Sequence, residues 1–111
     1  MISKTILSEL KSGKVNGYDS TDKAIMAWGV DKFIGDDSPG AAGIGLVKFN
    51  VNGSKFTGLV KVILNFHRKY DIVFGKLNNK TGIHQTVRVV NNLTADGLAQ
   101  TIDSFVEGDN A

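Results

Sequence analysis

Apolar and polar side chains alternate, with few exceptions, on both sides of the dipeptide Asn52-Gly53, and this pattern constrains the fold more than any other feature of the sequence. Before the dipeptide, the apolar positions are Val47, Phe49 and Val51, and the polar positions between them are Lys48 and Asn50. The run 54–64 continues the alternation. A period of two is typical of a strand with one buried face, and Asn-Gly favours a two-residue hairpin turn. The segment therefore predicts an antiparallel hairpin.

A two-residue turn at Asn52-Gly53 implies a definite register. It pairs Val51 with Ser54, Asn50 with Lys55, Phe49 with Phe56 and Lys48 with Thr57. One face of the hairpin then collects Val47, Phe49, Val51, Phe56, Val60, Val62 and Leu64. The other collects Lys48, Asn50, Lys55, Thr57 and Lys61, with Leu59 and Ile63 as apolar exceptions. A shift of one residue would mix the two sets, so the pattern itself favours a single pairing.

The rest of the chain supplies further strands and flanking helices. Apolar spacing predicts a short helix over 3–12, a helical turn within 21–28 and an amphipathic helix over 94–107 that ends at Gly108. Alternation predicts strands over 69–77 and 83–90, whereas 35–43 and 78–82 have the composition of loops and 30–34 suits a strand or a loop. We therefore expect a single α+β domain over residues 1–111. It would contain an antiparallel meander sheet of four strands, or five, with the N-terminal helices and the C-terminal helix packed on one face.

Charge is unevenly distributed along the 111 residues. The net charge of +2 divides into −1 over residues 1–44, +7 over residues 45–91 and −4 over residues 92–111. The basic block coincides with the predicted strands, and the acidic end with the predicted C-terminal helix. Charge separated in this way produces a strong local field although the total is small. It predicts either a solvated outer sheet face or a surface that binds a partner.

Several classes of chemistry lack the residues they need. The chain has no cysteine, which excludes disulfides and cysteine-based metal sites. The glycine-rich segment 35–45 leads into a strand without the Gly-Lys-Ser/Thr of a phosphate-binding loop. The candidate metal ligands, His67, His84, Asp36 and Asp37, do not have the spacing of a site. We expect no cofactor, no metal and no catalytic activity.

Localisation follows from the same composition. No apolar run approaches the roughly 20 residues of a membrane-spanning helix, and the N-terminus lacks the apolar core of a signal peptide. We expect a cytoplasmic protein that does not act at a membrane.

The candidate binding surface is the cationic side of the predicted sheet. Its residues are Lys48, Lys55, Lys61, Arg68, Lys69 and Arg88. One reading is a protein partner or self-association, in which the acidic C-terminal helix of one copy contacts the basic face of another. The alternative is a nucleic acid, bound through phosphate neutralisation. Base stacking would then depend on Trp28 or Tyr70, because the other strand aromatics alternate onto the apolar face.

Three segments of the C-terminal half also resemble small accessory proteins of phages and mobile elements. They are VKVILN, YDIVFGK and LAQTIDSFVE, within Lys55 to Glu107. The matching positions are mainly Val60, Val62, Tyr70, Ile72, Phe74, Ile102 and Val106, which are core residues. The resemblance implies no catalytic or binding residue. It implies a compact, inhibitor-like or accessory binding protein directed at a host or a defence system.

Overall fold

The computed structural model describes residues 2–13, 15, 18, 21–30, 32–37, 43–78, 80 and 82–108. The helices are α1 (Ile2–Ser12), α2 (Thr21–Ala27), the 3₁₀ turn η2 (Ala95–Gly97) and α3 (Leu98–Val106). The strands are β1 (Ile34–Asp36), β2 (Gly45–Asn52), β3 (Thr57–Leu64), β4 (Tyr70–Asn78) and β5 (Ile83–Leu93). They form one antiparallel sheet in the order β1-β2-β3-β4-β5. The predicted α+β meander is confirmed, with five strands.

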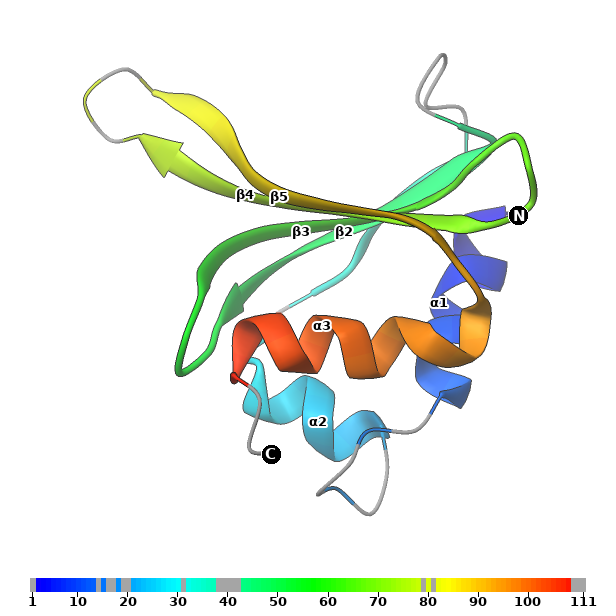
Figure 1. Ribbon diagram of the computed structural model, residues 1–111, viewed down its shortest axis with the longest axis horizontal. Coiled ribbons are helices and arrows are strands. Elements are labelled where there is room, and N and C mark those ends of the chain that lie inside the picture. The colour runs from blue at the N-terminus through cyan, green and yellow to red at the C-terminus, as the bar shows by residue number, and fades with distance from the viewer. Residues whose placement is uncertain are drawn as a thin grey trace.

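The helices cover a single face of this sheet. α1 and α2 precede β1 and α3 follows β5, and in Figure 1 all three lie below the sheet. A hairpin joins each strand to the next, so the chain crosses neither face between β1 and β5. Helical segments are therefore available only at the two ends of the sheet-forming region.

The core lies between the sheet and the helices. Its fully buried side chains come from both layers and include Ile6, Leu10, Trp28, Val47, Phe49, Val60, Val62, Ile72, Phe74, Leu98, Ile102 and Val106. The apolar face predicted for 47–64 is therefore confirmed. Burial of each such side chain contributes roughly 1.5–3 kcal/mol before the cost of ordering the chain.

The predicted register of the β2–β3 hairpin is wrong by four residues. Val51 pairs with Gly58 and Asn52 with Thr57, so the loop comprises residues 53–56 rather than Asn52-Gly53 alone. The end of α3 holds this longer loop, because the Val106 carbonyl oxygen accepts hydrogen bonds from the amides of Lys55 and Phe56 at 2.8 and 3.1 Å. A shift of four is even, so the strand residues keep their predicted faces.

Two further predictions about the strands are corrected. β1 begins at Ile34 and continues into the segment predicted as a loop, so the strand considered over 30–34 is misplaced. Residues 38–42 of that loop, and residues 79 and 81 of the turn predicted over 78–82, lie outside the described residues.

A β-bulge in β5 changes the faces predicted for that strand. Phe74 pairs with Arg88 but Gly75 pairs with Thr86, which leaves Val87 as the extra residue. Simple alternation places Thr86 and Arg88 on one face. In the structure, Thr86 shares the face of Gly75 and Arg88 shares the helix-covered face of Phe74.

The C-terminal helix begins later than predicted and buries one unexpected residue. Residues 95–97 form a 3₁₀ turn, and the α-helix starts at Leu98. Its buried side is Leu98, Ala99, Ile102, Asp103 and Val106. The burial of Asp103 departs from the amphipathic pattern predicted for 94–107, in which charged residues lie on the solvent side.

We expect Gly53→Ala to destabilise the fold, because a Cβ at position 53 would overlap the carbonyl oxygen and the side chain of Val106. The loop and the end of α3 would have to separate, at a cost of roughly 1–3 kcal/mol. Chemical denaturation measures the change. Gly97→Ala is the matched control, since a Cβ there meets nothing within 4 Å and helix propensity favours alanine. Equal stability of the two variants would contradict the close contact.

Candidate functional site

The face of the sheet opposite the helices, here called the open face, is built from three cross-strand rows. The first row is Asp36, Leu46, Ile63 and Asp71. The second is Ile34, Lys48, Lys61, Val73 and Val89. The third is Asn50, Leu59, Gly75 and Thr86. Aliphatic side chains therefore dominate this face, and the lysines occupy its centre.

Lys48 and Lys61 are directly opposite each other on β2 and β3. Like charges in this position destabilise a sheet. Within the part of the chain that the structure describes, neither ammonium group forms a salt bridge or a hydrogen bond. Both side chains are half-buried among their aliphatic neighbours. The pair is therefore a local concentration of positive charge without a compensating carboxylate.

Two hollows on the open face lie on either side of Leu59. The larger, of about 230 Å³, is lined by Lys32, Ile34, Lys48, Phe49, Asn50 and Leu59. The smaller, of about 90 Å³, is lined by Leu59, Lys61, Val73, Gly75, Gln85 and Thr86. Gly75 has no side chain to fill the second hollow. Each hollow includes one of the paired lysines, so the face offers apolar depressions beside positive charge.

The other four predicted surface residues lie elsewhere. Lys55 is in the β2–β3 loop, where its side chain passes close to Gly108. Arg68 and Lys69 are exposed in the turn between β3 and β4. Arg88 lies on the helix-covered face, where it pairs with Phe74 and alternates regularly with Val90. The structure brings together only Lys48 and Lys61, and a single six-residue cationic face is not formed.

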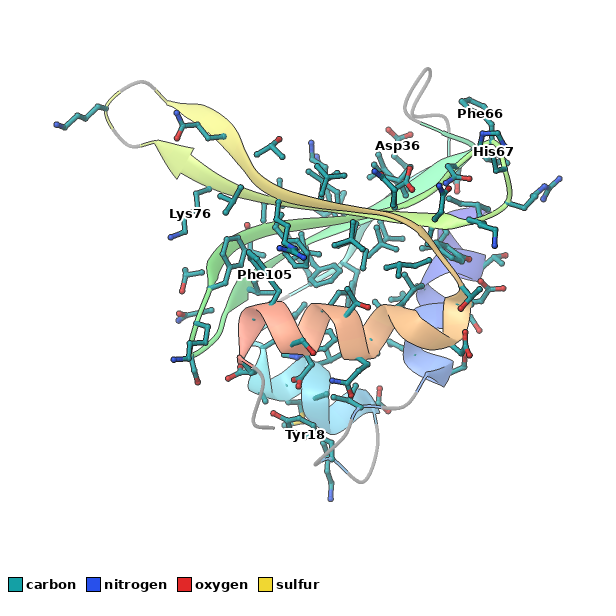
Figure 2. All side chains as sticks on the ribbon, in the orientation of Figure 1. Tyr18, Asp36, Phe66, His67, Lys76 and Phe105 are labelled. Carbon is teal, nitrogen blue, oxygen red and sulfur yellow. The ribbon has the colours of Figure 1, made fainter. Side chains whose placement is uncertain are left out.

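Asn65 organises the turn that carries Arg68 and Lys69. Its Oδ1 accepts hydrogen bonds from the amides of His67 and Lys69 at 2.9 and 3.1 Å. Its Nδ2 donates to Asp71 Oδ1 at 3.0 Å and to Asn92 Oδ1 at 3.1 Å. This buried amide therefore ties the turn to β4 and β5. Figure 2 shows Phe66 and His67 on this turn, beyond the end of the sheet.

Neither aromatic residue proposed for base stacking is accessible. Trp28 is fully buried and stacks on Phe49 with ring centroids 6.4 Å apart. Tyr70 is buried and its hydroxyl donates a hydrogen bond to Glu9, which together with burial raises the pKa of the tyrosine. The exposed aromatic that the sequence reasoning missed is Phe66, at 64% exposure. Phe66 lies in a turn whose other residues are polar or basic, and this sequence feature could have indicated that it is exposed.

Asp103 forms the buried polar contact of the helical layer. Its carboxylate accepts a 2.9 Å hydrogen bond from Trp28 Nε1, which joins α3 to the end of α2. Burial raises the pKa of Asp103, the Trp28 hydrogen bond opposes this shift, and the nearby Glu107 adds to it. Glu107 in turn accepts hydrogen bonds from the amide and the hydroxyl of Ser54, at 3.2 and 2.7 Å. These carboxylates therefore hold the helices and the β2–β3 loop together.

The candidate metal ligands are not assembled. Among the described residues, no three His, Asp or Glu side chains come close enough to hold an ion. The side chain of His84 lies outside the described residues. Within the same residues, no helix has the length and hydrophobicity to cross a bilayer.

Comparison with protein-family models, with curated proteins and with solved structures found no match to this chain. The resemblance to phage and mobile-element accessory proteins stays a prediction.

We expect Asn65→Ala to lower the free energy of unfolding by roughly 2–3 kcal/mol, because it removes a buried amide and leaves its partners unsatisfied. His67→Ala, on the exposed part of the same turn, should change it by less than about 0.5 kcal/mol. Urea denaturation of the two variants gives the comparison. Similar losses for both would show that Asn65 does not organise the turn.

We expect Asp103→Asn to raise the thermal unfolding midpoint at neutral pH by a few degrees. The asparagine keeps an acceptor for Trp28 Nε1 and removes a buried charge. Because the folded-state pKa lies above the ordinary 3.8, native Asp103 binds its proton more tightly than the unfolded chain does. Wild-type stability therefore falls as pH rises through the interval between the two pKa values.

The difference in thermal unfolding midpoint between Asp103→Asn and wild type should accordingly be small at acid pH, below both pKa values of Asp103, and largest at neutral pH. Calorimetry across pH measures it. Asp96→Asn, an exposed carboxylate near the start of the same helix, serves as the control. A variant less stable than wild type at neutral pH would mean that the buried carboxylate is net favourable.

Proposed function

We propose that this chain is a small, non-catalytic binding protein that docks a protein surface on its open face, and that a second copy of the chain is such a partner. The supporting observation is the composition of that face, where aliphatic side chains surround the pair of Lys48 and Lys61. Ile34 and Val89 are 44% and 47% exposed. Contiguous apolar surface of this kind, bordered by polar groups, is typical of protein interfaces.

The lysine pair supports a partner that carries carboxylates. Directly opposed lysines cost stability, and a single polar residue at either position would avoid the cost. Residues that destabilise the local structure without a compensating contact are expected at functional sites. A carboxylate placed over the Lys48–Lys61 pair would compensate both charges, and the flanking aliphatic side chains would exclude water from the contact.

The open face is self-complementary in charge. Asp36 and Asp71 occupy the row next to the lysine row. Two copies can face each other across a two-fold axis that runs parallel to the rows, so that their strands are antiparallel. If the copies are displaced by one row, the row of Asp36 and Asp71 in each copy lies over the lysine row of the other. Strands about 4.8 Å apart with about 3.3 Å per residue give a face of roughly 24 by 20 Å. Because the displacement leaves two of the three rows in contact, the pair would bury on the order of 600 Å², which is the size of a weak interface.

The C-terminal helix is a poorer source of the carboxylates. Asp103 is buried against Trp28 and Glu107 binds Ser54. Asp96 accepts a hydrogen bond from Thr94. All three acidic groups of the described part of this segment are therefore engaged within their own chain. Asp71 Oδ1 also accepts hydrogen bonds, from Asn65 and Asn92. The sheet-to-sheet pair is favoured because Asp36 and Asp71 lie on the open face itself, in the row next to the lysines.

The nucleic-acid alternative has less support. Two of the six predicted basic residues, Lys48 and Lys61, share the open face. The proposed stacking residues Trp28 and Tyr70 are buried. The exposed combination of Phe66 with Arg68 and Lys69 lies on a turn at the end of the sheet and not on the open face. Within the proposal, an accessory or inhibitor-like role of the phage type would use the open face to contact its target.

We expect Lys61→Gln to stabilise the isolated protein and to weaken its association. Removing one of two opposed charges should raise the free energy of unfolding by up to about 1 kcal/mol. Loss of the lysine's contact with the second copy should weaken dimerisation by about tenfold, or 1.4 kcal/mol. Sedimentation velocity at low and high protein concentration measures association, and urea denaturation at low concentration measures stability.

The matched control is Lys76→Gln, because Lys76 is an exposed base on the helix-covered side whose ammonium lies 5.8 Å from the centre of the Phe56 ring. It should leave association unchanged. A wild-type protein that stays monomeric at high concentration would refute the second copy as partner. If that monomer binds single-stranded DNA with a steep salt dependence, the nucleic-acid function would replace the proposed one.

A further inference from the structure

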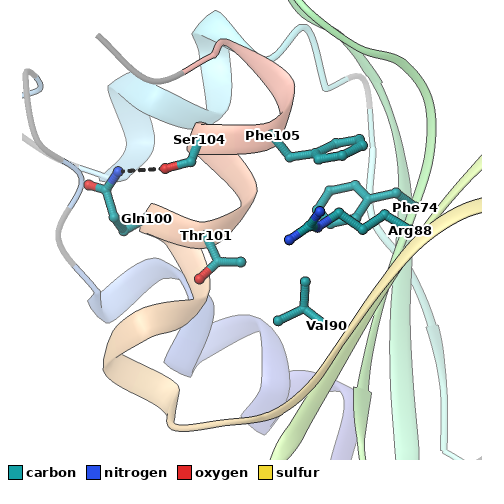
Figure 3. Close-up of a pocket in the computed structure, with 7 residues that line it drawn as sticks. All are labelled: Phe74, Arg88, Val90, Gln100, Thr101, Ser104 and Phe105. Atoms are coloured by element: carbon teal, nitrogen blue, oxygen red, sulfur yellow. Dashed lines mark hydrogen bonds between the residues drawn. The ribbon is translucent and has the colours of Figure 1, made fainter. Parts of the chain in front are cut away.

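A hollow of about 360 Å³ lies between α3 and the β4–β5 hairpin, on the face opposite the open face. It is lined by Phe74, Arg88, Val90, Gln100, Thr101, Ser104 and Phe105 (Figure 3). Its volume is near the lower end of the range of roughly 300–1,000 Å³ seen for small-molecule sites. The hollow therefore suits a small ligand rather than a macromolecule.

Arg88 is an unusual residue at its position in the sheet. It pairs with Phe74 on the face that otherwise packs against the helices, in the row next to Ile72 and Val90. Arg88 alternates regularly with Val89 and Val90, and the bulge at Val87 turns Thr86, not Arg88, to the other face. In Figure 3 the guanidinium of Arg88 points into the space between β5 and α3. Among the described residues, Arg88 has no carboxylate partner and no hydrogen bond, and it is exposed. An exposed guanidinium beside apolar side chains favours an anionic ligand.

The wall that faces Arg88 is aromatic. Phe74 and Phe105 stack with ring centroids 4.1 Å apart and an interplanar angle of 29°. Val90 extends this apolar surface. Phe74 is fully buried under this contact, so Phe105 and Val90 supply the apolar surface that remains accessible. Such a surface favours a flat apolar group.

Two hydroxyl groups of α3 complete the lining. Ser104 Oγ accepts a 3.1 Å hydrogen bond from Gln100 Nε2, so its own proton is available to a ligand. Thr101 Oγ1 donates to the Gly97 carbonyl oxygen at 2.8 Å, so it offers only lone pairs. In Figure 3 both hydroxyl oxygens point away from Arg88. The hollow thus combines one cationic donor, Arg88, with an aromatic and aliphatic wall.

We propose that this hollow binds a small carboxylate with a flat apolar body. Arg88 would bind the carboxylate through paired N–H···O hydrogen bonds, and the half-buried Phe105 and Val90 would contact the body. A monoanion fits better than a phosphate dianion because Arg88 is the one charged residue among the seven that line the hollow. The site is independent of the proposed docking function, since it lies on the other face of the sheet.

An NMR titration with phenylacetate tests the proposal. We expect the amide signals of Arg88, Thr101 and Phe105 to shift, and the neutral analogue phenylacetamide to bind at least about tenfold more weakly. Inorganic phosphate and acetate should also bind more weakly, because one mismatches the charge and the other lacks the apolar body. A short peptide that ends in phenylalanine, with a free or an amidated C-terminus, distinguishes a peptide carboxylate from a free small acid.

Variants make the result specific to Arg88. Arg88→Gln should weaken phenylacetate binding by at least about tenfold and Arg88→Lys by less, because lysine keeps the charge but not the paired geometry. Lys76→Gln, on the same face but outside the hollow, should leave binding unchanged. Equal binding of phenylacetamide, equal binding by folded Arg88→Gln, or no shift at these three amides would overturn the proposal.

Discussion

Side chains of an antiparallel strand alternate between two faces, and in this chain both helical segments pack on the same one. The strand order β1-β2-β3-β4-β5 has no crossover, and the helices that the structure describes lie before the first strand and after the last. Trp28 joins these two ends, because its indole binds Asp103 of α3 and its carbonyl oxygen accepts the amide of Asn52 in β2. The interaction closes the helical layer beneath the sheet and leaves the opposite face to solvent or to a partner.

This one-sided arrangement separates two possible activities. The open face is broad, aliphatic and positively charged at its centre, which suits a protein surface. The hollow beside α3 is small, aromatic and lined by one guanidinium, which suits a small anion. The pairing of Arg88 with Phe74 places this charge on the helix-covered face, whereas the bulge at Val87 returns Thr86 to the open face.

The alternation of apolar and polar residues correctly predicted the features that depend only on neighbouring residues in the sequence. The two faces of β2 and β3 were correct despite the wrong register, because the error of four residues is even. The register itself depends on a tertiary contact, the capture of the loop by the Val106 carbonyl oxygen. The face of Thr86 relative to Arg88 depends on a bulge that alternation does not reveal. The burial of Asp103 depends on Trp28, a partner 75 residues away. Leu59 and Ile63 were recognised as apolar exceptions on the lysine side of the hairpin. The structure shows that they belong to a larger aliphatic surface, which also contains Leu46, Val73 and Val89.

The most direct test of the account is the accessibility of methyl groups to a soluble paramagnetic probe, measured by NMR at increasing protein concentration. At low concentration, the methyl signals of Leu46, Leu59 and Val73 should broaden strongly, while those of Val60 and Val62 on the helix-covered face stay sharp. At high concentration, the open-face methyl groups should become protected as a second copy covers them. Open-face methyl groups that stay equally accessible at every concentration, or that are already protected in the dilute protein, would contradict the account.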